Sequence, residues 1–224
     1  MRALPAHEIV SLRERGDALS HLERSLLLFA VAEPDLSREQ LAGAPLGRRD
    51  AALLELRRLT FGEVLPCSAV CPSCGERLEF SFSVGQLLAI APRTPPETPD
   101  FQLPSTASLE AAARAPDRSA ARRALIEHCA GSMLSDAEAA DMASRIAEAD
   151  PLAEVILDAR CTSCGHEWPL LFEIAEYFWR EVSAEATRLL DQVGELARVF
   201  GWREQDILAM SAWRRRRYLE MATA

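Results

Sequence analysis

The segment CPSCGERLEFSF at residues 71–82 has a pattern that returns as CTSCGHEWPLLF at residues 161–172. Each copy begins with a Cys-x-x-Cys pair, continues with a glycine and leads into a strand-like run. Two cysteines at this spacing, in a turn between strand-like segments, can bind one tetrahedral metal ion, and the glycine accepts the positive φ that the turn needs. Each copy is therefore typical of a zinc knuckle.

Two knuckles supply four thiolates, which satisfies the closed coordination of one structural zinc ion. We therefore predict a single zinc ion bound by Cys71, Cys74, Cys161 and Cys164. The interval between the two pairs exceeds the usual spacing within a zinc ribbon, so the segment between them must leave a small ribbon and rejoin it. The expected fold class is mainly α with a small β zinc ribbon (α+β), a four-Cys ribbon split by a helical insertion.

Other interpretations of the cysteines fit less well. A redox-active pair begins a helix, whereas both pairs here lead into strands, and disulfides are not expected in a cytosolic chain. Cys67 and His166 lie close enough to the knuckles to replace a ligand, but Cys67 has no second turn with it and His166 is placed to point away from the metal. Cys129, beside His128 in a helical segment, is expected to be a small buried residue.

Composition and charge exclude several classes of protein. The 224 residues carry a net charge of −9, and all 25 basic residues are arginine, so we expect no non-specific nucleic-acid binding. The longest apolar run, Leu26–Ala32, is far too short to cross a bilayer, and the N-terminal segment has charges where a signal peptide needs its apolar stretch. We therefore expect no membrane insertion and a cytoplasmic location with reduced cysteines.

Local signals place helices and strands around the knuckles. Capping boxes at Ser20, Ser37 and Ser135 begin helices. A helix after residue 46 carries Leu53, Leu56 and Leu59 as a core-facing stripe and stops at residues 61–62, and period-two alternation over residues 78–84 predicts a half-buried strand. The regions we expect are an N-terminal helical region (1–62), the first knuckle and its strands (63–90), a Pro-rich crossing and helical insertion (91–150), the second knuckle and its strands (151–173) and C-terminal helices (174–224).

The sequence offers no set of catalytic residues. It has no phosphate-binding glycine loop, nucleophile elbow or His-Glu-x-x-His motif. Its carboxylates are scattered over helix faces or placed as caps, and no pair of them stands out. We therefore expect a protein that is not an enzyme and that binds no cofactor besides zinc. A metalloenzyme, by contrast, would need an open metal position, usually with histidine or a carboxylate among the ligands.

The C-terminal helices contain the best candidate for a partner-docking surface. Trp202, Trp213 and Tyr218 lie there, and aromatic residues and arginine are enriched at interfaces. The alternative, that these aromatics pack a terminal helical hairpin, is favoured by the usual burial of such residues. The run of four arginines at residues 214–217 is expected to be a solvated helix face rather than a nucleic-acid or acidic-partner contact.

Four stretches together resemble a known family: LGRRDAALLELRRLTFG (46–62), CPSCGERLEFSFSV (71–84), CTSCGHEWPLLFEIAEYFW (161–179) and GELARVFGWREQDILAMSAWRRRRYLEM (194–221). The chain is similar to T4-type baseplate hub assembly proteins or chaperones, which occur with contractile phage tails and phage-tail-like contractile injection systems. Residues 91–150 are the least matched. The resemblance implies a role in assembling or forming the baseplate and hub, tube, spike or tape-measure proteins as partners, a place in the contractile particle, and no catalytic residues.

A zinc-ribbon nucleic-acid-binding or transcription-associated module is the alternative function. Such a module should present a basic ribbon face with exposed aromatics. The sequence beside the knuckles is instead neutral to acidic, with Glu76, Arg77 and Glu79 after the first and His166 and Glu167 after the second. The sequence therefore favours an assembly or structural protein.

Overall fold

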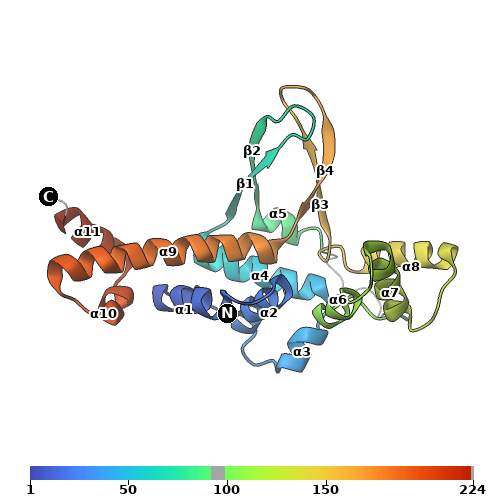
Figure 1. The fold of residues 1–224 in the computed structure, drawn as a ribbon, viewed down its shortest axis with the longest axis horizontal. Coiled ribbons are helices and arrows are strands. Elements are labelled where there is room, and N and C mark those ends of the chain that lie inside the picture. Colours follow the sequence, from blue (N-terminus) through green and yellow to red (C-terminus); the bar gives the residue numbers. More distant parts are fainter. Residues whose placement is uncertain (92–98, 223–224) are drawn as a thin grey trace.

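The long helix α9 (Ile174–Phe200) runs through the helical body of the molecule and organises its core (Figure 1). Its buried positions recur at helical spacing, which gives the helix one continuous apolar face. That face packs against α1, α2, α4, α10 and α11 in a single hydrophobic core. The computed structural model describes residues 1–91 and 99–222.

The elements follow the order that the sequence predicts, with helices before, between and after the two knuckles. Besides α9 they are α1 (Ala6–Gly16), α2 (His21–Ala32), α3 (Arg38–Gly43), α4 (Leu46–Phe61), β1 (Val64–Val70), β2 (Arg77–Ser83), α5 (Val84–Leu88), α6 (Thr106–Ala112), α7 (Arg118–Ala130), α8 (Asp136–Ala149), β3 (Val155–Arg160), β4 (Glu167–Phe172), α10 (Glu204–Ala209) and α11 (Ala212–Ala222). The protein is thus mostly helical with two small antiparallel sheets, which is an α+β fold.

Helix boundaries lie where the local signals place them. Ser20, Ser37 and Ser135 each form the capping box that the sequence predicts. The prediction for Leu59 was wrong, because its side chain is 46% exposed. Leucines at successive spacings of three residues drift around a helix by about 60° per step, so Leu59 has turned away from the core that Leu53 enters.

Two β hairpins rise from the same side of the helical body, and their turns meet at the far end (Figure 1). The first hairpin pairs β1 with β2, and the second pairs β3 with β4, both antiparallel. The strands form two separate two-stranded sheets, with no strand pairing between them in the described part of the chain. In both hairpins half-buried residues alternate with exposed ones, as the period-two pattern of residues 78–84 predicts for β2.

An ion pair between a buried arginine and a partly buried glutamate fixes the base of the first hairpin against α9. Arg57 donates to both carboxylate oxygens of Glu181, at 2.8 and 2.6 Å, and to the carbonyl oxygens of Gly62 and Val64 at 2.7 and 2.8 Å. The side chain of Arg57 is only 2% exposed. The guanidinium therefore holds α4, the start of β1 and α9 in one arrangement.

Helices α6, α7 and α8, which lie between the two hairpins in the sequence, form a lobe at one end of the body (Figure 1). Helices α7 and α8 enclose a small hydrophobic cluster built on Ile126, Ala139 and Met142. The lobe is attached to the start of α4 by two hydrogen bonds. The Leu46 N–H donates to the carbonyl oxygen of Pro104 at 2.9 Å, and the Gly47 N–H donates to the carboxylate of Asp150 at 2.9 Å. The helical insertion expected within residues 91–150 contains α6, α7 and α8, whereas residues 92–98 of the Pro-rich crossing lie outside the described residues.

The described helices include none that is both long enough and apolar enough to span a bilayer. The longest, α9, has charged residues along its exposed face.

Candidate metal centre

Each knuckle is a tight turn closed by two backbone hydrogen bonds. In the first, the Cys71 N–H donates to the Glu76 carbonyl at 2.8 Å and the Gly75 N–H donates to the Cys71 carbonyl at 2.9 Å. Gly75 has φ of 76°, a conformation that favours glycine. The second knuckle repeats both bonds, at 2.9 Å from Cys161 to His166 and at 2.9 Å from Gly165 to Cys161, and Gly165 has φ of 72°.

The turns bring the four predicted cysteines together at the joined ends of the hairpins. All four Sγ atoms lie within 4.8 Å of one another. The Cys71 and Cys164 sulfurs are 3.7 Å apart, and those of Cys74 and Cys161 are 3.6 Å apart. A tetrahedron with metal–sulfur bonds of about 2.3 Å has edges of about 3.8 Å, so these two distances match those between thiolates that share one metal ion.

The two hairpins are built alike beyond the cysteines. Phe82 and Phe172 occupy the same position in each hairpin relative to its knuckle, and they meet edge to face with ring centroids 4.9 Å apart. Leu65 and Val155 also correspond in position, and both are buried at the hairpin bases. The repeat of residues 71–82 in residues 161–172 ends on these two phenylalanines, and Leu65 and Val155 extend it to six residues before the first cysteine of each pair.

Burial within the centre is uneven. Cys71 and Cys161, the first cysteine of each knuckle, are 1% exposed, whereas Cys74 and Cys164 are exposed. The inner pair is thus shielded from solvent and the outer pair lies at the surface. A metal ion bound by all four would lie close to the surface, with its inner ligands protected.

Hydrogen bonds in the turns favour thiolate at one position and oppose it at another. The backbone N–H of Cys164, and then that of Ser163, lower the pKa of Cys161 to about 7. At Cys74 the backbone N–H of Glu76 acts to lower the pKa, but hydrogen bonds with the neighbouring thiols raise it to about 12. Thiols this close cannot all ionise by themselves, because like charges repel. A bound cation removes that conflict.

The other residues considered as ligands lie outside the cluster. Cys67 faces the same side of its hairpin as Phe80, its cross-strand partner, and burial raises its pKa. His166 stacks on Trp168, with ring centroids 5.8 Å apart. Cys129 is buried in α7, as predicted.

The surface around the centre carries more acid than base. Glu76 and Arg77 lie beside the first knuckle, and exposed Arg160 and Glu167 flank the second with nitrogen and oxygen atoms 3.6 Å apart. Glu79 and Asp158 add further negative charge along the hairpins. The neutral-to-acidic surroundings that the sequence predicts are confirmed.

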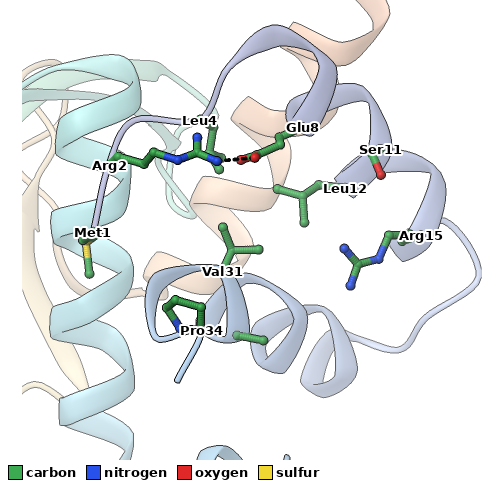
Figure 2. Close-up of a pocket in the computed structure, with 10 residues that line it drawn as sticks. Met1, Arg2, Leu4, Glu8, Ser11, Leu12, Arg15, Val31 and Pro34 are labelled. Atoms are coloured by element: carbon green, nitrogen blue, oxygen red, sulfur yellow. Dashed lines mark hydrogen bonds and ion pairs between the residues drawn. The ribbon is translucent and has the colours of Figure 1, made fainter. Parts of the chain in front are cut away.

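A pocket of about 580 Å³ lies between α1 and α2 (Figure 2). Its apolar lining includes Leu4, Leu12 and Val31, and its polar lining includes Arg2, which pairs with Glu8. None of its lining residues is a cysteine or histidine. The pocket therefore shares no residue with the cysteine cluster and has no thiol or imidazole ligand for a metal ion.

The donor set indicates which ion the cluster suits. Four sulfur donors within 4.8 Å of one another fit a thiophilic ion, and four thiolates leave no position in a tetrahedral shell for an oxygen ligand. The cluster can thus hold a metal ion. Comparisons of the chain with models of protein families, with curated protein sequences and with solved structures find no match.

Proposed function

We propose that this chain is a non-enzymatic assembly factor or structural component of the baseplate or hub of a contractile tail or injection system, stabilised by one structural zinc ion. The zinc ion would join two hairpins into a split four-cysteine ribbon. The observation that carries the structural part of the proposal is the approach of four sulfurs to within 4.8 Å from knuckles on either side of the inserted helices.

A fully thiolate site supports a structural role for the metal. Catalytic zinc keeps a fourth position open for water or substrate, whereas four cysteines close the coordination shell. Zinc bound in this way connects segments that are distant in sequence, and its binding free energy becomes part of the folding free energy. Such a site suits a protein whose function depends on a fixed arrangement of its segments.

The distribution of the family-like segments supports the baseplate part of the proposal. The four stretches that resemble the family form α4, the two knuckles with the strands that follow them, and the helices α9, α10 and α11, all joined through the main core or the hairpins. Helices α7 and α8, in the least matched region, have a hydrophobic cluster of their own. The resemblance therefore follows one structural unit.

Binding to baseplate proteins tests this function. The chain would be co-expressed, one at a time, with the tube, spike and tape-measure proteins of the same contractile system and purified through an affinity tag. We expect one of these proteins to remain bound through size-exclusion chromatography at physiological salt. Failure of all of them to associate would contradict the proposal.

A nucleic-acid assay separates this function from the zinc-ribbon alternative. The acidic residues around the knuckles give phosphates little to bind. We expect no mobility shift of double-stranded DNA or of RNA at physiological salt. A shift that weakens steeply as salt rises would favour a nucleic-acid module instead.

A further inference from the structure

Helix α11 packs on the protein through one face only. On that face Arg215 is 5% exposed and donates to the side chain of Gln192 at 3.2 Å and to the carbonyl oxygen of Met210. The solvated face expected for the four arginines was therefore wrong for Arg215. Tyr218 follows on the same face and completes the attachment of α11 to the body.

Packing accounts for two of the three aromatic residues in this region. Trp202 stacks on Phe200 with ring centroids 4.6 Å apart, and Tyr218 meets Trp202 edge to face at 4.8 Å. These side chains join the core, as the packing alternative expected. Trp213 does not, because 71% of it is exposed.

The outward face of α11 combines exposed apolar groups with positive charge. Trp213 and Met221, which is 56% exposed, project from it. Arg214 and Arg216 are exposed, and their guanidinium groups have no hydrogen-bond or ion-pair partner within residues 1–91 and 99–222. Arg217 pairs with Glu220 at 2.9 Å. We name this surface the α11 face and define it by Trp213, Arg214, Arg216, Arg217 and Met221.

The α11 face contrasts with the rest of the chain, whose net charge of −9 includes these arginines. Tryptophan and arginine are the residues that most often dominate binding free energy at protein interfaces. The Trp213 side chain has a large apolar area, and 71% of it lies in contact with water. Both features indicate a surface that is completed by another molecule.

We propose that the α11 face docks on an acidic surface of a partner protein, which receives the Trp213 indole in an apolar pocket. The partner's carboxylates would pair with Arg214 and Arg216, which have no partner within the described residues. This inference rests on the proposed function, because it takes the partner to be a component of the same baseplate.

Charge favours an acidic protein over nucleic acid as the occupant. Nucleic-acid affinity depends on many phosphate contacts, whereas the α11 face offers three exposed arginines on an acidic chain. Three arginines and one indole are enough for the centre of a protein interface, where a few residues supply most of the affinity. The α11 face is therefore better suited to an acidic protein than to nucleic acid, and the binding experiment below distinguishes the two.

Two variants remove the two features separately. Trp213→Ala removes the indole, and the triple change of Arg214, Arg216 and Arg217 to Glu reverses the charge. Because these side chains are exposed, we expect both variants to keep the wild-type melting temperature. Met133→Ala is the control for the first, since Met133 is 82% exposed elsewhere. The change of Arg114, Arg118 and Arg122 to Glu is the control for the second, since these arginines are exposed on or near α7.

The experiment measures the Kd of each variant for the tube, spike or tape-measure protein that binds the wild-type chain. We expect each α11 variant to bind at least about tenfold more weakly and both controls to bind within about twofold of wild type. The charge-reversed variant should also lose most of the salt dependence of association.

Each other outcome overturns the inference in an identifiable way. If the wild-type chain binds a baseplate protein and the α11 variants bind it equally well, the α11 face is not the docking surface, although the proposed function stands. If no baseplate protein binds the wild-type chain, the proposed function fails and the inference fails with it. Binding of DNA that the arginine variant abolishes and its control retains would assign the α11 face to nucleic acid.

Discussion

The sulfur atoms of Cys71 and Cys164 lie 3.7 Å apart, although 93 residues separate them in the sequence. Each belongs to a different hairpin, and the inserted lobe lies between them along the chain. A metal ion shared by these cysteines closes a long loop, which removes much conformational freedom from the unfolded chain. This contact connects the sequence repeat with the stability of the whole fold.

Loss of one ligand should destabilise the whole protein. We expect Cys161→Ser to abolish stoichiometric metal binding and to lower the melting temperature by about 10 °C or more. Metal binding contributes several kcal/mol to folding, and each kcal/mol shifts the midpoint of a chain of this size by about 2–4 °C. Cys67→Ser is the control, because Cys67 lies outside the cluster. Equal melting of the two variants by calorimetry would count against a structural metal.

The attachment of the inserted lobe depends on a glycine. A Cβ atom at Gly47 would lie 1.7 Å from Oδ1 of Asp150, so Gly47→Ala must displace the carboxylate that accepts the Gly47 N–H. We expect a loss of about 2 kcal/mol in unfolding free energy, since hydrogen bonds to charged groups contribute about 1.5–3 kcal/mol. Gly194→Ala, where a Cβ meets nothing within 4 Å in α9, should instead stabilise by roughly 1 kcal/mol. Urea unfolding measures the unfolding free energy of both variants. Similar changes at the two sites would contradict the close contact between Gly47 and Asp150.

The buried ion pair should matter more than an exposed one. Glu181→Ala leaves the guanidinium of Arg57 buried without its carboxylate, which we expect to cost about 3–5 kcal/mol. Glu55→Ala removes the partner of Arg58, in a pair whose side chains are 35% and 46% exposed, and should cost less than about 1 kcal/mol. The unfolding free energies of the two variants from urea titrations check this order, and the reverse order would show that Arg57 is not held as described.

The free energy of unfolding should depend on pH through the ionisation of Asp150. Burial raises its pKa, although the Gly47 N–H and Arg49 act to lower it. A carboxyl with a raised folded pKa stabilises the protein fully below its unfolded pKa, of about 4, and loses that contribution as pH rises through the folded pKa. We therefore expect the unfolding free energy of the wild type minus that of Asp150→Asn to fall as pH rises from about 4. The amide oxygen can still accept the Gly47 N–H, so a flat or rising difference would exclude this role of Asp150.

The sequence predicts those features that depend on neighbouring residues. The Cys-x-x-Cys-Gly turns, the capping boxes at Ser20 and Ser135 and the alternation of β2 are all confirmed, because hydrogen bonds and side-chain periods within a few residues determine them. Even the meeting of four distant cysteines was predictable, since a tetrahedral site needs four ligands and each knuckle supplies two.

Features that depend on tertiary contacts were missed or wrong. The sequence does not show that the Arg215 side chain of α11 reaches Gln192 on α9, or that the Gly47 N–H donates to the Asp150 carboxylate. Each of these depends on how elements far apart in the chain meet, and local periodicity carries no signal of that.

The zinc content of the purified protein distinguishes one metal ion shared by the two hairpins from two separate ions or none. Protein prepared in reducing, chelator-free buffer would be analysed by inductively coupled plasma mass spectrometry against its concentration from amino-acid analysis. A site shared by all four cysteines predicts about one zinc per chain, and about none in Cys161→Ser. Two zinc ions per chain, or none in the wild-type protein, would contradict a single ion held between the two hairpins.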